Sequence, residues 1–320
     1  MDIAGDIGGT HTRLALFDSG AGGPAALEVY PSREHDGLES MIRAFLASHP
    51  AAVERACFGV AGPVQNGHVK TTNLAWPVDA RSVAGVLGIE QVGLVNDLYA
   101  NAYGIADLGP DDIVTLREGD PSMGGNAAVI SAGTGLGEAG LFWDRRRYHV
   151  FASEGGHTDF GPRDDDELAL RAYLARNHAH VSYERVCSGM GLVAIHDFLS
   201  QREGTGVGRT DASAIAKAAL DGSDPVCVRA LDMMVRIYGA EAGNLALKLL
   251  ATGGIYVGGG IAPRILPRLR DGGFLEALDA KGRFAGLLSR IPVHVILNDR
   301  TALLGAARLA RGDVPGLHHR

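Results

Sequence analysis

The sequence predicts an α/β protein made of two similar modules with a cleft between them. Short apolar runs alternate with amphipathic helices along most of the chain, which is the pattern of layered α/β folds. The same order of elements restarts near residue 113. Gly-Thr turns also stand at corresponding places in the two halves, at Gly9-Thr10 and Gly133-Thr134. A repeated order of elements with repeated turns indicates a duplicated module.

The first module is predicted to begin with three antiparallel strands. They span residues 2–6, 12–17 and 27–30, and Gly8-Gly9 is a hairpin signal between the first two. Apolar residues at helical spacing then predict a helix over 38–46. Two further strands, at residues 55–60 and 92–95, are each followed by a helix, at residues 79–87 and 98–105. Asp79 is expected to cap the first of these two helices.

The second module repeats this order with a helical insertion. Strands are predicted at residues 113–116, 127–132, 139–143, 148–151, 254–257 and 293–297. The stretch 164–250 is mostly helical, although the residues from Tyr183 are expected to form a strand before a helix capped by Ser188. The last helix of this stretch has heptad-like apolar spacing over fewer than three repeats, which favours a core helix over a coiled coil. A final helix is predicted over 301–310.

The charge balance and the cysteines exclude several classes of protein. Acidic residues outnumber Lys and Arg by 37 to 30, which argues against binding to nucleic acid or to an anionic membrane. The three cysteines, Cys57, Cys187 and Cys227, are far apart and form no Cys-x-x-Cys pair, which indicates reduced thiols. The sequence shows neither a signal-peptide pattern nor an apolar run of transmembrane length. We therefore expect a cytoplasmic protein that binds neither nucleic acid nor membrane.

Glycine is over-represented, at 45 of 320 residues, about twice its usual share of ~7%. Several glycines fall in three loops, each at the end of a predicted strand. In the first loop, Gly8 and Gly9 let the backbone turn its N–H groups toward an anion, and two threonine hydroxyls add donors. Asp6 could hold a magnesium ion through water, and Arg13 could offset phosphate charge. An ordinary Gly-Gly hairpin is the alternative.

The second loop, residues 131–137, has the same donors at the end of another strand. Its Gly135-x-Gly137-x-x-Gly140 matches the dinucleotide-binding fingerprint by letter. That fingerprint requires a helix after its first glycine pair, whereas strands are predicted here, so an NAD-dependent oxidoreductase is the weaker hypothesis. No Gly-Lys pair occurs in the chain, which excludes a Walker A loop.

The third loop, residues 253–263, contains the triple glycine Gly258, Gly259 and Gly260. Backbone without side chains allows a flat ring to lie against it. Pro263 suits the first turn of a helix after these glycines. A tight strand-to-helix turn is the alternative, although such a turn would need fewer glycines.

Polar residues suited to a sugar lie between the loops. They are Asn96 and Asp97 at a strand end, Glu154 and His157 in a glycine-containing turn, and Glu184 near a helix start. Taken singly, each has a structural alternative, such as helix capping by Asp97. Together they suit a neutral polyol, because carboxylates and amides can bond two neighbouring hydroxyls at once. One carboxylate could also accept the proton of a hydroxyl that attacks phosphorus.

The three loops resemble those of the sugar kinase–heat-shock–actin ATPase superfamily, and the polar residues narrow the resemblance to the bacterial-type glucokinases. The resemblance covers nearly the whole chain through residues 6–16, 59–76, 95–100, 131–137, 154–160, 183–192, 253–263 and 303–307. His11, Met190 and Gly161 depart from the usual Asn, Pro and Ala of that family, but remove no carboxylate and no phosphate-loop glycine. The zinc-binding cysteine cluster of the related repressor/kinase group is not present in the sequence.

The resemblance implies two ribonuclease-H-like (actin-like ATPase) domains with a central cleft that closes on sugar. The small domain would contain residues 1–108 plus 298–320, and the large domain 109–297. Asp97 would be the general base, and the sugar would bind to Asn73, Asn96, Asp97, Glu154, His157 and Glu184, near the Gly62-Pro63 backbone. ATP would contact Gly5, Asp6, Ile7, Gly8, Gly9, Thr10, Thr12, Arg13, Gly133, Thr134, Gly135, Gly258, Gly259 and Gly260.

The activity implied by the resemblance is ATP-dependent phosphorylation of D-glucose at the 6-hydroxyl. Its cofactors would be ATP and Mg²⁺, with Asp6 acting on the metal through water. The protein is expected to be a homodimer. Two alternatives on the same fold are a hexose kinase of broader specificity and an actin-like ATPase that needs no sugar.

Overall fold

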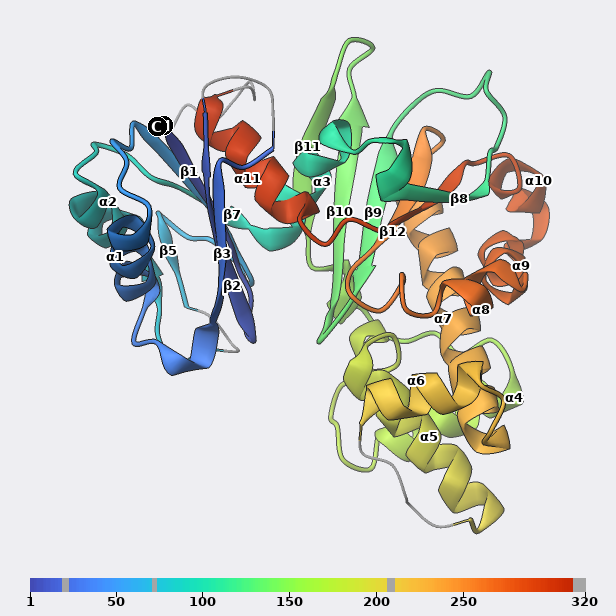
Figure 1. The fold of residues 1–320 in the computed structure, drawn as a ribbon. Coiled ribbons are helices and arrows are strands. Elements are labelled where there is room, and N and C mark those ends of the chain that lie inside the picture. The colour runs from blue at the N-terminus through green and yellow to red at the C-terminus, as the bar shows by residue number, and fades with distance from the viewer. Residues whose placement is uncertain (19–22, 71–73, 206–210, 313–320) are drawn as a thin grey trace. The chain divides into compact units, whose positions relative to one another are not determined.

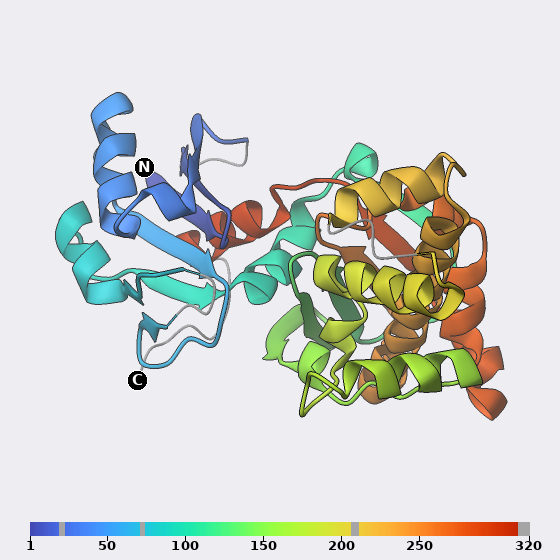
Figure 2. The same cartoon turned by 90° about the horizontal axis from the view of Figure 1, so that it is seen from below.

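The computed structural model describes residues 1–18, 23–70, 74–205 and 211–312. Two compact units divide the chain (Figure 1 and Figure 2). The first contains residues 1–109 and the segment from Asn298 onward, and the second contains residues 110–297. Each unit has one main β-sheet with helices packed on it, so the predicted α/β class is confirmed. Among the described helices, none is both long and apolar enough to cross a membrane.

The main sheet of the first unit has five strands in the order β3-β2-β1-β4-β7. Neighbours are antiparallel from β3 to β1 and parallel from β1 to β7. The strands are β1 (Asp2–Ile7), β2 (His11–Phe17), β3 (Ala26–Pro31), β4 (Arg55–Val60) and β7 (Gly93–Asn96). A separate two-stranded sheet pairs β5 (His68–Val69) with β6 (Val78–Asp79).

Helices cover both faces of this sheet (Figure 1). They are α1 (Leu38–Ser48), α2 (Ala80–Leu87), α3 (Asp97–Gly104) and α11 (Thr301–Arg311), with the 3-10 turns η1 (Ser32–Glu34) and η2 (Ile105–Asp107). Successive residues of a strand point to opposite faces. Ile3 therefore packs in the cluster that contains α1 and α2, and Ala4 in the cluster that contains α3 and α11. The C-terminal helix α11 thus belongs to the core of the first unit.

The sheet of the second unit has the strand order β11-β10-β9-β12-β13-β8. Its first five strands repeat the pattern of the first unit, antiparallel from β11 to β9 and then parallel to β13. This repeat confirms the predicted duplication. The strands are β8 (Ile113–Arg117), β9 (Ala127–Ala132), β10 (Leu136–Trp143), β11 (Tyr148–Ser153), β12 (Gly254–Gly258) and β13 (Val293–Ile296).

The helices of the second unit lie mostly between β11 and β12 in the chain. They are α4 (Asp165–Leu174), α5 (Gly189–Glu203), α6 (Ala212–Leu220) and α7 (Pro225–Leu249), followed after β12 by α8 (Leu266–Arg270), α9 (Gly273–Asp279) and α10 (Ala285–Leu288). Short 3-10 turns are η3 (Pro110–Asp112), η4 (Gly155–His157), η5 (Tyr183–Arg185) and η6 (Gly282–Phe284). As the heptad-like spacing predicted, α7 is a core helix, and its middle is buried.

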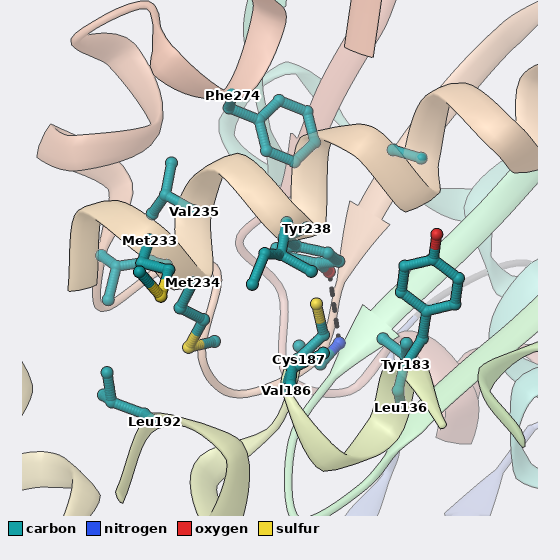
Figure 3. Close-up of a cluster of buried hydrophobic side chains, with 14 of the residues drawn as sticks. Leu136, Tyr183, Val186, Cys187, Leu192, Met233, Met234, Val235, Tyr238 and Phe274 are labelled. Carbon is teal, nitrogen blue, oxygen red and sulfur yellow. Dashed lines mark hydrogen bonds between the residues drawn. The ribbon is translucent and has the colours of Figure 1, made fainter. Parts of the chain in front are cut away.

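Tyr238 connects helix α7 to the end of strand β9. Its ring is fully buried among Cys187, Met234 and Phe274 (Figure 3). Its hydroxyl accepts a hydrogen bond of 3.2 Å from the Ala132 backbone nitrogen and donates one of 3.0 Å to the Ile130 carbonyl. Ala132 is the last residue of β9, so this tyrosine fixes the strand end from which the second glycine loop departs.

Two local predictions were wrong. Tyr183 to Arg185 form the 3-10 turn η5 instead of a strand, because the Tyr183 nitrogen donates to Thr158 and the Val186 nitrogen donates back to Tyr183. Ser188 nevertheless caps α5 as predicted, since its Oγ accepts from the Gly191 nitrogen at 3.1 Å. After the triple glycine the next helix begins at Leu266, so Pro263 lies in a turn before the helix.

Candidate active site

The first glycine loop is the turn between β1 and β2. The Gly8 nitrogen donates to the His11 carbonyl at 3.0 Å, and the Ser32 hydroxyl donates to the Gly8 carbonyl at 2.7 Å. Thr12 is fully buried and its hydroxyl bonds to that of Ser32, whereas the side chain of Thr10 is exposed. Only Thr10 therefore presents a hydroxyl on the surface of the loop.

Gly5 and Ile7 belong to the buried part of β1. A Cβ at position 5 would collide with the ring of Phe58, which explains the glycine by packing. Ile7 is fully buried in the same apolar cluster as Phe58. At these two positions, therefore, only backbone groups could contact a ligand.

Asp6 and Arg13 face each other across the β1–β2 ladder. An Arg13 Nη1 lies 3.3 Å from Asp6 Oδ2, and Nη2 donates to Asp299 Oδ2 at 2.9 Å. Burial raises the pKa of Asp6, and the guanidinium of Arg13 opposes that rise. The end of strand β1 thus carries a half-buried carboxylate beside a cation.

Asn96 and Asp97 mark the end of β7 and the start of α3. Asn96 is the helix cap: its Oδ1 accepts from the nitrogens of Leu98 and Tyr99, and its Nδ2 donates to the Gly62 carbonyl at 3.3 Å. Because Asn96 caps the helix, Asp97 is the first helical residue. The alternative interpretation of Asp97 as the helix cap is therefore wrong. Asp97 Oδ1 accepts from the Leu98 nitrogen at 2.9 Å, which fixes the carboxylate at the helix N-terminus.

The second glycine loop connects β9 to β10. The Gly133 nitrogen donates to the Gly135 carbonyl at 2.8 Å, while the Gly133 carbonyl accepts from the Gly189 nitrogen at 2.9 Å. Leu136 begins β10, so a strand follows the loop and the dinucleotide-binding hypothesis fails on context. The side chain of Thr134 is exposed at the tip of the loop.

Glu184 contacts this loop directly. Its Oε2 accepts a hydrogen bond of 3.0 Å from the Leu136 nitrogen, and a Cβ at position 135 would collide with the same oxygen. Its other oxygen, Oε1, lies 4.0 Å from His157 Nδ1. Glu184 therefore joins the glycine loop to a residue of the predicted sugar set.

His157 is the last residue of the turn η4, which follows β11, and Glu154 directly precedes that turn. Their segment pairs with the one that carries Glu184, since the Phe160 nitrogen donates to Val181 and the Tyr183 nitrogen donates to Thr158. Both side chains are exposed, and Glu184 is partly buried. The structure thus brings His157 and Glu184 together and places Glu154 at the start of the same turn.

A cavity of about 320 Å³ adjoins His157 and Glu184. It is also lined by Asn177, His178, Ala179, His180, Ser182 and Arg185. His180 Nε2 donates a hydrogen bond of 2.8 Å to the His157 carbonyl, and His180 Nδ1 lies 3.3 Å from Asp159 Oδ1. This segment was not predicted from the sequence to line a site, although the two histidines that flank Ala179 could have indicated it. The sugar-binding prediction for Asn73 falls outside the described residues.

The third glycine loop meets the start of the second. Gly259 has a φ of +82°, and a Cβ there would collide with the Ala132 carbonyl. The same carbonyl accepts from the Ile261 nitrogen at 3.2 Å. Gly258 is buried against Ser131, whereas Gly260 is exposed with open space where a Cβ would stand. Two of the loops predicted to hold ATP therefore lie against each other in the second unit.

Repeated α/β units, glycine loops at strand ends, and a carboxylate–histidine cluster beside one loop define a sugar kinase of the actin-like ATPase fold. The family model for glucokinases matches residues 3–313. The chain therefore belongs to the glucokinase family.

Glucokinases of known sequence are similar to this chain over nearly its full length. The chain is 44% identical to a glucokinase of a Nostoc species, covering 96% of this chain and 98% of the relative. It is 35% identical to a glucokinase of Pectobacterium atrosepticum, covering 97% and 96%.

Solved structures show the same fold. A glucokinase from an Antarctic psychrotroph aligns with a TM-score of 0.83 at 31% identity, covering 97% of this chain and 98% of that one. A ROK family glucokinase from Streptomyces griseus, in complex with glucose and AMPPNP, aligns with a TM-score of 0.68 at 25% identity, covering 97% and 99%.

Proposed function

We propose that this chain transfers the γ-phosphoryl group of ATP to the 6-hydroxyl of D-glucose, with Asp97 as the general base. Its membership of the glucokinase family over nearly the whole chain makes it an ATP-dependent glucose kinase. The observation that supports the assignment of residues is the position of Glu184. Its carboxylate accepts a hydrogen bond at the end of the second glycine loop and lies 4.0 Å from His157 Nδ1.

Asp97 has the chemistry and the orientation that a base in this reaction needs. Phosphoryl transfer asks a protein mainly for positioning and charge stabilisation, together with a group that accepts the proton of the attacking hydroxyl. The Leu98 nitrogen holds Asp97 Oδ1, which sets the direction of the carboxylate. The adjacent Asn96 uses its oxygen for the helix cap and one Nδ2 hydrogen for the Gly62 carbonyl, so we assign the second Nδ2 hydrogen to the sugar.

In this proposal the second unit supplies three of the groups that bind the sugar. Glu184 Oε1, His157 and Glu154 supply acceptors and donors for neighbouring hydroxyls. Hydroxyls bound by ionised groups form hydrogen bonds of about 1.5–3 kcal/mol each. Asn73 completes the set that we assign to glucose.

The triphosphate is assigned to the first two glycine loops and the adenosine to the third. Backbone N–H groups around Gly8 and Gly133 can turn toward phosphate oxygens. The oxygens of Asp6 suit Mg²⁺, which prefers oxygen ligands and keeps much of its water, so we assign Asp6 to the metal through water. When bound with ATP, Mg²⁺ neutralises charge that develops on the phosphates. The exposed Gly260 offers bare backbone to a ring.

A kinase assay across sugars tests this proposal. Production of ADP is coupled to a dehydrogenase, with ATP and glucose, mannose, fructose or N-acetylglucosamine as acceptors. We expect the highest kcat/KM with glucose. Equal values across hexoses would favour the broader-specificity kinase, and ATP hydrolysis without any sugar would favour an actin-like ATPase. Light scattering of the same sample tests the homodimer, which we propose as well.

A further inference from the structure

Glu138 is a buried acid that the proposed mechanism does not use. It lies in β10, two residues after Leu136, and its register partner in β11 is Ser153. Only 1% of the residue is exposed. The glycine loop thus ends just before Glu138, and the turn that carries Glu154 and His157 begins just after its strand partner.

The carboxyl of Glu138 lies directly beneath the sugar-binding turn. A Cβ at position 155 would collide with Glu138 Oε2, and one at position 156 would collide with the Leu136 carbonyl. Both glycines of the turn η4 therefore rest on β10 without intervening side chains, and Gly155 rests on the acid itself. A change at this carboxyl acts on Gly155 and, two residues further on, on His157.

A second buried acid faces Glu138 from α7. Glu241 is fully buried, and its oxygens accept from Asn244 Nδ2 at 2.8 Å and from Lys248 Nζ at 3.3 Å. The same Asn244 amide donates to the Tyr183 hydroxyl at 2.9 Å, next to Glu184 in the chain. Glu241 therefore has two donors, whereas Glu138 Oε1 is buried without a hydrogen-bond partner in the described part of the chain.

Two buried carboxylates in contact cannot both carry charge at low cost. Burial and the charge of Glu241 raise the pKa of Glu138 to about 8, and Lys248 opposes that rise. Cys187 and Tyr238 also interact with Glu138, but burial raises the pKa of both, so neither is charged near pH 8. Charge is therefore disfavoured on Glu138, whose Oε1 has no donor in the described part of the chain.

We propose that the uncharged carboxyl of Glu138 is a positioning group for the turn Gly155–His157, and that its ionisation weakens glucose binding. The inference rests on the proposed function, because it assigns the turn to the sugar. If Glu138 ionised, its carboxylate would be repelled by Glu241 and would move away from it. Gly155 lies against that carboxylate and would be displaced. His157 and Glu154 would then lose their places relative to Glu184.

The test is the pH dependence of the glucose KM at saturating ATP, for the wild type and for Glu138→Gln, which mimics the protonated acid. We expect the wild-type KM to rise about tenfold from about pH 7 to about pH 9, with a smaller change in kcat. Glu138→Gln should have a near-wild-type KM at pH 7 that stays flat to pH 9. The exposed Glu276→Gln, on α9 of the same unit, should behave like the wild type.

Several outcomes would overturn the role of Glu138. They are a wild-type KM that stays constant over this range, an equal rise in KM for the wild type and Glu138→Gln, or a pH-dependent change in kcat with no change in KM. If the Gln variant does not fold, Glu138→Met supplies an uncharged chain of similar length, and the wild-type profile remains decisive. Turnover of glucose by the wild type at pH 7 tests the proposed function separately. Absence of turnover would refute the kinase, whereas turnover with a pH-independent KM would refute the role of Glu138 alone.

Discussion

Glu184 Oε2 accepts a hydrogen bond of 3.0 Å from the backbone nitrogen of Leu136, while Oε1 of the same carboxylate lies 4.0 Å from His157 Nδ1. One side chain therefore supports the glycine loop that we assign to phosphate and faces the residue that we assign to sugar. A group shared by two sites can couple their affinities, and such coupling is reciprocal for binding.

Replacing Glu184 with Ala should weaken both substrates. The variant loses the acceptor that we assign to glucose and the hydrogen bond from the Leu136 nitrogen. We therefore expect the glucose KM to rise about 10- to 100-fold. We also expect a several-fold weaker affinity for AMPPNP measured by calorimetry without sugar. His157→Ala is the matched control, because it removes a side chain that we assign to the sugar and keeps the hydrogen bond between Glu184 and the loop. If Glu184→Ala leaves AMPPNP affinity at the wild-type value, the shared role is wrong.

Asp97→Asn should separate chemistry from binding. The Asn oxygen can still accept from the Leu98 nitrogen, so the helix start and the thermal stability should stay close to those of the wild type. An amide cannot accept the hydroxyl proton, and we expect kcat to fall about 10²- to 10⁴-fold with little change in glucose affinity. Asp36→Asn, at an exposed position of the same unit, serves as the control. Turnover near the wild-type rate would show that another group is the base.

Two neighbouring glycines should differ sharply in their tolerance of Ala. At Gly155 a Cβ would collide with the carboxyl of Glu138, whereas at Gly161 it would lie 3.5 Å from the Tyr183 hydroxyl, an ordinary contact. We expect Gly155→Ala to raise the glucose KM at least about tenfold, because the turn that we assign to the sugar must move. Gly161→Ala should keep the wild-type KM and gain up to about 1 kcal/mol of stability. Steady-state kinetics and thermal melts of the pair decide this.

Features set by local chemistry could be predicted from the sequence. Asp79 caps α2 through bonds to the nitrogens of Arg81 and Ser82, and its polar side chain before an apolar-periodic run signals that role. The Gly8-Gly9 hairpin and the duplicated strand order follow from short-range patterns as well.

Features set by distant partners could not be predicted. The residues from Tyr183 have strand-forming side chains, but they form the turn η5, in which the Tyr183 nitrogen donates to Thr158 and the Val186 nitrogen donates to Tyr183. Glu184 meets Leu136 across 48 positions, a distance at which no periodicity applies. Glu138 lies inside a glycine-rich motif whose letters gave no sign that its carboxyl would face Glu241 on α7. The sequence therefore predicted which residues bind the sugar without showing which distant groups support them.

The buried acid pair should also make stability depend on pH. The pKa of Glu138 rises from an ordinary 4.5 to about 8 on folding, so between these values the folded chain holds a proton that the unfolded chain releases. This contribution to the free energy of unfolding is fully present below about pH 4.5 and is lost as pH rises toward 8. The loss amounts to at most about 1.4 kcal/mol per pH unit.

Glu138→Gln removes this titration and keeps the uncharged shape. We therefore expect its advantage in Tm over the wild type to grow from about pH 5 to about pH 8, reaching several °C, since about 1 kcal/mol shifts the Tm of a unit of this size by ~2–4 °C. Thermal melts followed by circular dichroism at three pH values measure this. Glu276→Gln should show a constant difference from the wild type. A constant difference for Glu138→Gln as well would mean that Glu138 already carries its charge at neutral pH, which would remove the basis of its proposed role at the sugar-binding turn.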